Sequence, residues 1–382
     1  MTTKSVITAP AMLGMLGGGQ LGRFFVIAAH ELGYQVTVLD PDTNSPAGKI
    51  ADVHICADFD DEAALKQLAA TCIAVTTEFE NVPAKSLEKL AESIIVRPDA
   101  ACIAIAQNRV LEKNFIKNAG LPVAPFAVIN SADDLPDDTS VFYPAILKVA
   151  RFGYDGKGQT RVKNQVEALK AFDDFKQEIC VLEQMLPLDL EVSVVLARDA
   201  AGSIAAFPIA ENSHLNGILD ISIVPARCSE VLKANSQALA KKLAEKLDYV
   251  GVLGVEFFVV GNQLLVNEIA PRPHNSGHYT IDACVTNQFE QQVRVMTGLP
   301  LGDTSLHSNA VMVNILGDSW VNDAEPPWNK ALSHANLKLH LYGKHQPRKG
   351  RKMGHFTVIG QDAKAALNIA KIARSGLHIG AS

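Results

Sequence analysis

The chain carries the glycine-rich sequence Phe152-Gly153-Tyr154-Asp155-Gly156-Lys157-Gly158-Gln159, which begins four residues after Lys148. The apolar run 142–149 precedes it, and the segment 160–162 is expected to form a returning strand. Glycines let a hairpin backbone approach an anion closely, and successive N–H groups with a lysine ammonium neutralise phosphate charge. The spacing differs from the Walker motif, which needs G-x-x-x-x-G-K-[ST] at the start of a helix. The stretch predicts a phosphate-covering flap between two strands; the alternative is an ordinary hairpin with a glycine-rich turn.

The composition predicts a globular protein of two or three domains, because 382 residues with 48% hydrophobic residues can bury a large core. A formal net charge of -6 gives no basic field, so general nucleic-acid binding is not expected. Six cysteines lie among apolar neighbours without C-x-x-C pairing, which predicts buried free thiols in a reducing compartment. The apolar segment 6–16 is too short to span a bilayer. We therefore expect a soluble cytoplasmic protein without a membrane partner.

A second glycine-rich motif lies near the N-terminus. The segment 17–22 fits G-x-G-x-x-G between the apolar strand expected over 11–16 and a helix expected to about Leu32. A second buried strand, 34–39, ends at Asp40, so the order predicts a parallel βαβ unit. An acid at this offset is where a dinucleotide fold holds a ribose. Taken alone, the motif favours an NAD-dependent dehydrogenase or a nucleotide-sensing binder, although the same fold also occurs without a dinucleotide.

Acidic residues follow the next expected strand, 73–77. Glu78 and Glu80 come directly after it, with Asn81 beside them. The carboxyl ends of parallel strands form the ligand edge of such a sheet. The pattern favours a substrate site, and the alternative is a solvated turn before the helix that begins at Pro83.

Two helices are expected further along the chain. The segment 100–119 is expected to form one helix that carries Arg109 and Lys113, and Gly120 ends it, which indicates a domain boundary near residue 120. The second helix is expected over 166–175. Its apolar positions recur at helical spacing and are assigned to the core: Val166, Leu169, Phe172 and Phe175.

Two acids interrupt apolar strands in the second half of the chain. Glu256 lies in the run 254–259 and Glu268 in the run 264–269, and a turn at 261–262 is expected to make these strands adjacent and antiparallel. An acid buried in a strand is costly unless it is paired or bound to a metal. With Asn267, the two carboxylates supply the oxygen ligands that Mg²⁺ prefers beside a nucleotide. The alternative is a pair of solvent-facing acids on one polar face.

Two loops carry anion-binding groups. The stretch 270–278 is stiffened by two prolines and presents a guanidinium, two imidazoles and an amide, which suits a phosphorylated or carboxylated substrate. Lys344 and the segment 348–352 form a cationic cluster before a strand expected over 356–359. The alternative for this cluster is a basic surface loop.

Together these motifs make the chain similar to the ATP-grasp superfamily and, within it, to the 5-(carboxyamino)imidazole ribonucleotide synthase family. The matching stretches are collinear from about residue 12 to 360: 17–23, 77–83, 153–159, 210–214, 267–278 and 350–355. The resemblance implies an α/β protein with an ATP-grasp fold and a C-terminal α+β domain. It divides the chain into an N-terminal Rossmann-like (pre-ATP-grasp) domain over 1–120, an ATP-grasp lid domain over 121–205 and a C-terminal ATP-grasp domain over 206–382.

The resemblance implies an ATP-dependent carbon–nitrogen ligase of purine biosynthesis. ATP would phosphorylate bicarbonate to carboxyphosphate, which would deliver carbon dioxide to the exocyclic amine of 5-aminoimidazole ribonucleotide. ADP and phosphate would leave. Magnesium and a homodimeric state are implied as well. The nearest alternative within the superfamily is a formate-dependent glycinamide ribonucleotide transformylase, whose product would be formylated.

The resemblance also assigns residues to each ligand. ATP would contact Arg109, Lys148, Gly153, Tyr154, Asp155, Gly156, Lys157, Gly158, Gln159, Glu183, Gln184, Met185, Leu186, Glu191, His214, Asn267 and Glu268. The ribonucleotide would contact Gly19, Gln20, Leu21, Glu78, Tyr154, Asp155, Arg272, His274, Asn275, Lys344, Arg351 and Lys352. Glu256, Asn267 and Glu268 would hold Mg²⁺. Arg272, His274 and Asn275 would be the catalytic residues.

Overall fold

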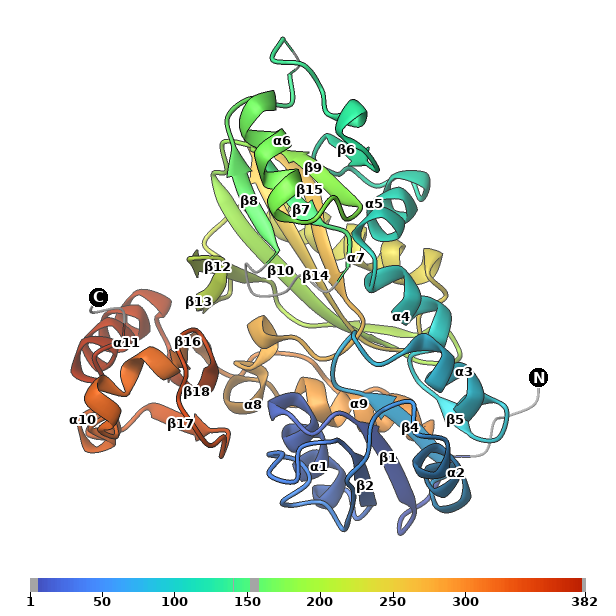
Figure 1. Cartoon of the computed structure of the whole chain (residues 1–382). Coiled ribbons are helices and arrows are strands. Elements are labelled where there is room, and N and C mark those ends of the chain that lie inside the picture. Colours follow the sequence, from blue (N-terminus) through green and yellow to red (C-terminus); the bar gives the residue numbers. More distant parts are fainter. Residues whose placement is uncertain (1–5, 140, 152–157, 380–382) are drawn as a thin grey trace.

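The computed structural model describes residues 6–139, 141–151 and 158–379. These residues form three β-sheets with helices packed against them (Figure 1). Most of the predicted flap lies outside the described residues, including five of the residues assigned to ligands: Gly153, Tyr154, Asp155, Gly156 and Lys157.

The N-terminal sheet is parallel, with strand order β3-β2-β1-β4-β5. Its strands are β1 (Met12–Leu16), β2 (Gln35–Leu39), β3 (Val53–Ile55), β4 (Ala74–Thr77) and β5 (Ile95–Val96). Its helices are α1 (Gln20–Glu31), α2 (Glu62–Thr71) and α3 (Ala84–Ala91). The predicted βαβ unit is confirmed, because β1 pairs in parallel with β2 and α1 connects them. The carboxyl ends of β1, β2 and β4 therefore share one edge of the sheet.

The expectation of a single helix over 100–119 is wrong. The chain forms α4 (Ala100–Ala106) and then α5 (Arg109–Asn118). Asn108 has extended backbone angles, φ -133° and ψ 111°, and its side chain accepts the N–H groups of Val110 and Leu111. This is an N-cap, which starts a new helix and ends the previous one. As a result Arg109 stands at the first position of α5.

The second sheet is antiparallel, in the order β6-β9-β7-β8, and it projects from the rest of the chain in Figure 1. Its elements are β6 (Phe126–Ile129), the 3₁₀ turn η1 (Ala132–Asp134), β7 (Ala145–Val149), β8 (Gln159–Val162), α6 (Gln165–Asp174) and β9 (Cys180–Gln184). The β7–β8 pairing that the flap requires is confirmed, with Lys148 opposite Gln159. Gly158, just before β8, has a φ of +69°, which favours glycine.

The prediction that all four apolar positions of α6 are core is wrong for two of them. Phe172 is buried and Phe175 packs against the same cluster, but Val166 is 73% exposed and Leu169 is 42% exposed. The helix buries Ala168, Ala171 and Phe172 against the small sheet. Only one narrow face of α6 has a partner, so the flanking apolar positions face outward.

The third sheet has nine strands in the order β15-β14-β10-β12-β13-β16-β18-β17, with β11 paired to β10. The strands are β10 (Leu190–Arg198), β11 (Ile204–Ala206), β12 (Ala210–Leu215), β13 (Ile218–Val224), β14 (Gly251–Val260), β15 (Gln263–Ala270), β16 (Asn309–Leu316), β17 (Leu337–Leu341) and β18 (Lys352–Gly360). The remaining helices are α7 (Glu230–Lys246), η2 (Asn275–Gly277), α8 (Thr280–Ala283), α9 (Gln288–Thr297), η3 (Gly317–Ser319), η4 (Val321–Asp323), α10 (Trp328–Leu332) and α11 (Ala363–Gly376). The predicted β14–β15 hairpin is confirmed, and its turn residue Gly261 has a φ of +60°.

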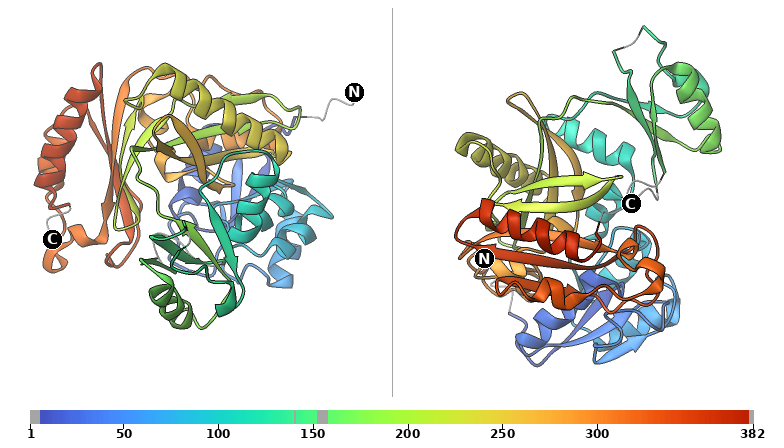
Figure 2. Two further views of the ribbon diagram at one scale, coloured as in Figure 1. Left: turned by 90° about the horizontal axis from the view of Figure 1, so that it is seen from above. Right: turned by 90° about the vertical axis from the view of Figure 1, so that its left-hand side faces the viewer.

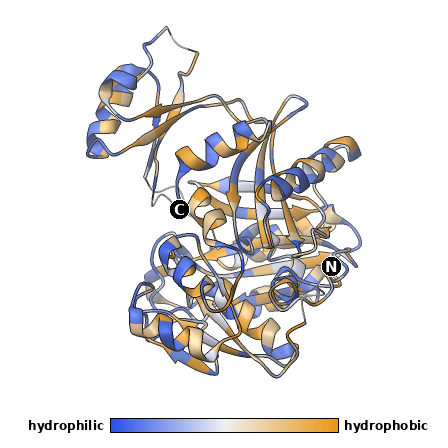
Figure 3. Cartoon of the chain, turned by 90° about the vertical axis from the view of Figure 1, so that its right-hand side faces the viewer, coloured by the Kyte–Doolittle hydropathy of each residue, from blue (hydrophilic) through white to orange (hydrophobic). Residues whose placement is uncertain are grey.

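Helices cover this long sheet at both ends. Figure 2 shows α11 along the strands of the C-terminal part, and α7 covers the part near β10 and β14. Both hydrophilic and hydrophobic residues occur along the helices (Figure 3). None of the helices in the described ranges is long and apolar enough to cross a membrane. All six cysteines are free, but Cys56 is exposed and Cys228 is half-buried, so the prediction of uniformly buried thiols is wrong for these two.

Candidate active site

The glycine turn before α1 binds protein carboxylates. Glu78, just after β4, accepts the N–H groups of Gly19 at 2.5 Å and of Gly22 at 2.8 Å. Asp40, just after β2, accepts the N–H of Gly18 at 2.6 Å. These are the groups with which a helix N-terminus would bind a pyrophosphate. The turn that suggested a dinucleotide site thus uses these donors to hold Glu78 and Asp40.

Burial of Glu78 raises the pKa of its carboxyl group, although the glycine N–H groups and the charge of Lys344 act in the opposite direction. Lys344 lies in the loop between β17 and β18, and its Nζ donates to Gln20 Oε1 at 2.5 Å. The structure therefore brings Gln20, Glu78 and Lys344 together, as the sequence assignment requires. Leu21 differs from them, because its side chain packs in the hydrophobic core of the N-terminal sheet.

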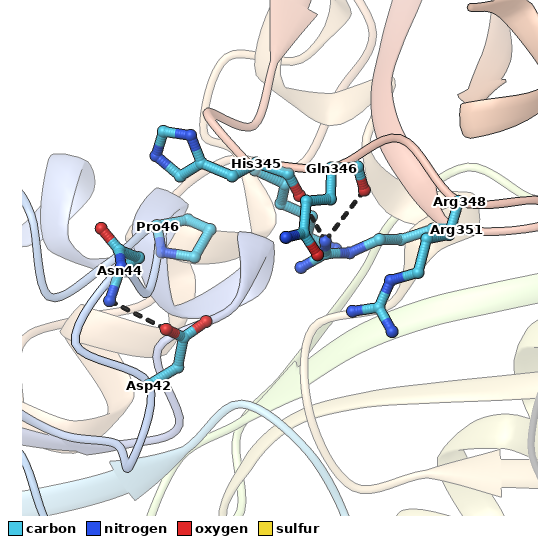
Figure 4. A pocket seen from close by; sticks show the side chains of 8 residues that line it. Asp42, Asn44, Pro46, His345, Gln346, Arg348 and Arg351 are labelled. Atoms are coloured by element: carbon cyan, nitrogen blue, oxygen red, sulfur yellow. Dashed lines mark hydrogen bonds between the residues drawn. The ribbon is translucent and has the colours of Figure 1, made fainter. Parts of the chain in front are cut away.

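A cationic hollow of about 150 Å³ lies beside Lys344 (Figure 4). It is lined by Asp42, Asn44, Pro46, Lys344, His345, Gln346, Arg348 and Arg351. The guanidinium of Arg351 donates to the carbonyl oxygens of His345 at 2.5 Å and Gln346 at 3.2 Å, so its own loop holds it in place. The hollow has the charge and the size to take a phosphate group.

The two acids in the third sheet face each other directly. Glu256 of β14 is opposite Glu268 of β15, and Asn267 Nδ2 donates to Glu256 Oε2 at 3.4 Å. Burial raises the pKa of Glu256 to about 7, and the neighbouring charge of Glu268 adds to this shift. Arg109 Nη2 lies 3.4 Å from Glu268 Oε2. Their predicted pairing on adjacent strands is confirmed.

This donor set fits a magnesium ion. Asn267 Oδ1 is buried and accepts no hydrogen bond from any of the described residues, which leaves an oxygen lone pair available beside the two carboxylates. A hard divalent cation relieves both the repulsion between the largely buried Glu256 and the half-buried Glu268 and the unsatisfied amide oxygen. Glu256, Asn267 and Glu268 are therefore the residues that could hold it.

Two lysines share one buried carboxylate. Glu183 of β9 lies 3.0 Å from Lys148 of β7 and 3.4 Å from Lys113 of α5, measured from Glu183 Oε2 to each Nζ. Burial alone would raise the pKa of Glu183, but the two lysines lower it to about 2. Lys113 also donates to the backbone oxygen of Asn267 at 2.8 Å. Lys113 thus links the small sheet to β15, the strand that carries Glu268, and Lys148 shares its carboxylate partner.

The segment that follows β15 carries all three predicted catalytic residues. Arg272 Nε donates to Glu80 Oε2 at 2.6 Å and its Nη2 to Glu80 Oε1 at 3.2 Å. His274 is buried and its Nε2 lies 3.5 Å from Glu256 Oε1. Burial and the charge of Arg272 lower the pKa of His274 to about 3, so this imidazole is neutral at pH 7. Asn275 is also buried, and within the part of the chain that the structure describes neither of its side-chain polar atoms has a hydrogen-bond partner.

The proposed nucleotide residues beyond the acid pair occupy the adjoining strands. His214 Nδ1 of β12 lies 2.8 Å from Glu191 Oε2 of β10. Burial would lower the pKa of His214, but the carboxylates of Glu191, Glu256 and Glu268 outweigh it and raise the pKa. Gln184 ends β9, and Met185, which is 39% exposed, and half-buried Leu186 follow it. Lys352 begins β18, and its charge also acts on His274.

Two residues that make important contacts in the site, Lys113 and Glu80, were not predicted from the sequence to contact a ligand. Lys113 lies one helical turn after Arg109, so the i, i+4 spacing on α5 is a signal that both side chains face the same site. Glu80 comes two residues after Glu78, but its partner Arg272 is 192 residues away in the chain. That pairing has no local signal.

Comparison with known proteins identifies the class. Residues 11–107 match the ribonucleotide synthetase preATP-grasp domain, residues 114–289 the ATP-grasp domain, and residues 310–369 the phosphoribosylaminoimidazole carboxylase C-terminal domain. The chain is thus an enzyme of the ATP-grasp class, with a pre-ATP-grasp domain before the ATP-grasp domain and a further domain after it.

Full-length relatives narrow this class to one family. A curated protein from Bacillus subtilis (strain 168), the N5-carboxyaminoimidazole ribonucleotide synthase, is 43% identical over 94% of this chain and 94% of its own length. A crystal structure of an ADP complex of such a synthetase superposes with a TM-score of 0.91 at 41% identity, covering 99% of this chain and 98% of that one. An Aspergillus clavatus synthase in complex with ADP and 5-aminoimidazole ribonucleotide gives a TM-score of 0.86 at 32% identity, covering 96% and 98%. The chain belongs to the N5-carboxyaminoimidazole ribonucleotide synthase family, a family of ATP-dependent ligases of purine biosynthesis.

Proposed function

We propose that the chain uses ATP and bicarbonate to carboxylate the exocyclic amine of 5-aminoimidazole ribonucleotide. The products are N5-carboxyaminoimidazole ribonucleotide, ADP and phosphate. The main structural support is the ion pair of Arg272 with Glu80. It joins the loop after β15, the strand of Glu268, to the loop after β4, which carries Glu78, so the acid pair of the proposed nucleotide site and the turn of the proposed ribonucleotide site are linked by one cation.

On the nucleotide side, Arg109 and Lys148 would contact the phosphates of ATP. Lys148 is buried beside Glu183 and can exchange this partner for a phosphate, while Lys113 continues to neutralise the carboxylate. Glu191 would accept the ribose hydroxyls, with His214 beside it. When bound at Glu256, Asn267 and Glu268, magnesium would neutralise charge on the phosphoryl group.

The proposed contacts of ATP also include Gly158, Gln159, Glu183, Gln184, Met185 and Leu186.

On the ribonucleotide side, the phosphate would occupy the hollow beside Arg351 and Lys344, within reach of Lys352. A charge-assisted contact to a phosphate contributes about 1.5–3 kcal/mol. Glu78 and Gln20 would face the aminoimidazole end.

The reaction needs an oxygen of bicarbonate to attack the γ-phosphorus of ATP, which forms carboxyphosphate and releases ADP. The C–O bond of carboxyphosphate then breaks to give carbon dioxide and phosphate. The amine forms the new C–N bond and loses one proton. Arg272, His274 and Asn275 would bind the oxygens of the one-carbon unit, because they lie close together in the segment 272–275 after β15 and the polar groups of His274 and Asn275 are shielded from water.

We further propose three units, one around each sheet, with the first boundary near residue 120 as expected and the second boundary earlier than the expected 205. Because β10 pairs with β14 and β12, we place the second boundary within 185–189, between β9 and β10. A cytoplasmic location is supported by the six free cysteines. The homodimeric state follows from the family resemblance alone and can be measured by light scattering.

The reaction is tested by pairing each one-carbon donor with each ribonucleotide. We expect ADP release to require bicarbonate and 5-aminoimidazole ribonucleotide, and mass spectrometry to detect the acid-labile carboxylated product. Formate with glycinamide ribonucleotide should give no product. A formylated product, with no response to bicarbonate, would assign the chain to the transformylase reaction instead.

A further inference from the structure

A line of buried hydrogen bonds crosses the third sheet and ends at His274. Ser222 Oγ of β13 donates to Asn212 Oδ1 of β12 at 2.8 Å, and Asn212 Nδ2 donates to Ser193 Oγ of β10 at 2.8 Å. Ser193 Oγ donates to Ser276 Oγ at 2.7 Å, and Ser276 Oγ lies 2.8 Å from His274 Nδ1. All five side chains are at least nine-tenths buried. Burial of polar groups this far from water costs folding free energy unless the groups hydrogen-bond to one another.

The donors and acceptors along this line all run in one direction. The amide of Asn212 can donate to Ser193 only through its nitrogen, so the Ser193 hydroxyl hydrogen is directed to Ser276. Ser276 Oγ accepts that hydrogen, so the hydrogen of the Ser276 hydroxyl is directed to His274 Nδ1. The backbone N–H of Ser276 also points at His274 Nδ1, at 3.4 Å. With the Ser276 hydroxyl as its main donor and this longer contact as a second, Nδ1 is an acceptor and the ring proton is on Nε2.

The Nε2 atom faces the reaction site. It lies 3.5 Å from Glu256 Oε1, on the side of the acid pair. Gly254 of β14 lets the ring approach the strand, because a Cβ at this position would lie only 2.7 Å from the Cβ of His274. The imidazole therefore directs an N–H, and no lone pair, toward the space where the one-carbon unit would react.

We propose that Asn212, Ser193 and Ser276 are positioning residues that hold His274 in its Nε2–H form, so that it acts as a hydrogen-bond donor to the reacting oxygens and not as a general base. The catalytic part of this proposal rests on the proposed function. The assignment of the tautomer does not rest on the proposed function, because the tautomer can be measured in the absence of any reaction. A fixed N–H donor suits carboxyphosphate, whose oxygens carry negative charge that must be stabilised before it decomposes.

The tautomer is measured directly by nitrogen NMR of the full chain labelled with ¹⁵N-histidine, with the His274 signals identified by their absence in His274→Gln. We expect a protonated Nε2 and an unprotonated Nδ1 at pH 7. A proton on Nδ1 would overturn the proposal, whatever the activity of the enzyme. If His274 carries its proton on Nε2 but the chain shows no bicarbonate-dependent turnover, the proposed role of the positioning residues is supported. Only the proposed function is then contradicted.

Asn212→Asp tests whether the line of hydrogen bonds sets this state. A carboxylate at 212 accepts from both Ser222 and Ser193, so Ser193 no longer donates to Ser276 and the direction of the line reverses. We expect a proton to appear on His274 Nδ1 and kcat to decrease tenfold or more, with the KM for ATP changed less than twofold. Asn314→Asp is the matched control, because Asn314 is a buried asparagine of the same sheet that donates to Leu219 O and is outside the line. An unchanged tautomer in Asn212→Asp, or an equal change in Asn314→Asp, would contradict the proposal.

Substitution of His274 separates a donor from a base. Glutamine places an N–H near the position of Nε2, whereas alanine does not. We expect His274→Gln to retain at least tenfold more turnover than His274→Ala. Equal turnover in the two variants would overturn the donor role.

Discussion

Four glutamates in this site have very different protonation behaviour, and their neighbours explain the differences. Burial and an adjacent carboxylate raise the pKa of Glu256 to about 7, and burial also raises the pKa of Glu78. Burial acts on Glu80 and Glu183 as well, but nearby cations outweigh it and lower each pKa to about 2. Residue type alone therefore says little about charge here. The partner within about 4 Å decides it.

Glu268→Gln keeps the shape of the side chain but removes one of the two charges of the predicted magnesium site. We expect kcat to decrease by at least 10²-fold while the thermal unfolding temperature stays close to that of the parent, because charge at this position serves the phosphoryl group. Steady-state assays at saturating magnesium check this. Glu230→Gln, on the exposed first turn of α7, should have no effect. Near-parental turnover of Glu268→Gln would remove it from the site.

The Glu80–Arg272 pair makes stability depend on pH in a defined direction. The pKa of Glu80 is about 2 in the folded chain and 4.5 ordinarily, so its stabilisation is complete above pH 4.5 and is lost as the pH decreases toward 2. We expect Glu80→Gln to lower the free energy of unfolding by about 2 kcal/mol at pH 7 and by progressively less below pH 4.5. Thermal unfolding of both chains between pH 7 and pH 3.5 measures this. Glu62→Gln, which breaks the exposed pair with Lys89, is the control and should show no such trend.

At this scale the sequence predicts the acids but not all of their partners. Glu256 and Glu268 are predictable because an acid inside an apolar strand is anomalous, and because a short turn forces the two strands to pair. The ion pair of Glu80 with Arg272, and the line from Ser222 to His274, join residues on different elements. Serine and asparagine are also ordinary surface residues, so only the sheet order shows that they meet.

At the scale of elements, turns and caps carry the information that periodicity lacks. The hydrophobic pattern predicts β1, β2 and β4 of the N-terminal sheet and the β14–β15 hairpin correctly, but it does not predict the short strands β3 and β5. It does not detect the break between α4 and α5, because the N-cap Asn108 lies inside an otherwise helical pattern. It also overestimates the burial of α6, since periodicity cannot report how large the facing sheet is.

The loop between β17 and β18 is expected to bind the ribonucleotide phosphate through Arg351. Because its guanidinium is already held by two carbonyl oxygens of the loop, it meets the ligand with little loss of conformational freedom. We expect Arg351→Ala to raise the KM for 5-aminoimidazole ribonucleotide about ten- to hundredfold and to leave the KM for ATP nearly unchanged. Lys349→Ala is the control, because Lys349 is exposed in the same loop and does not line the hollow. An effect confined to ATP would place this loop in the nucleotide site.

In the whole molecule, α5 joins the small sheet to the long one. Lys113 binds both Glu183 of β9 and the backbone oxygen of Asn267 in β15, while Glu112 Oε1 accepts the N–H of Ile269 at 2.7 Å. The chain that follows α5 also docks on β15, because the N–H of Val266 donates to Pro122 O at 2.7 Å. A ligand held between Lys148 and the acid pair would contact both sheets and so stabilise their junction.

Nucleotide binding should therefore stabilise the whole chain. A ligand present at 100 times its dissociation constant adds about 2.7 kcal/mol to folding stability, which for a protein of this size is a shift of several degrees. We expect Mg-ATP to raise the unfolding temperature by that amount and NAD to leave it unchanged, because Glu78 and Asp40 hold the N–H groups of the glycine turn. ATP with a chelator should give a smaller shift than Mg-ATP, since the acid pair then repels the uncompensated phosphates. Stabilisation by NAD, with none by Mg-ATP, would show that the N-terminal turn binds a dinucleotide after all and that the acid pair is not a nucleotide site.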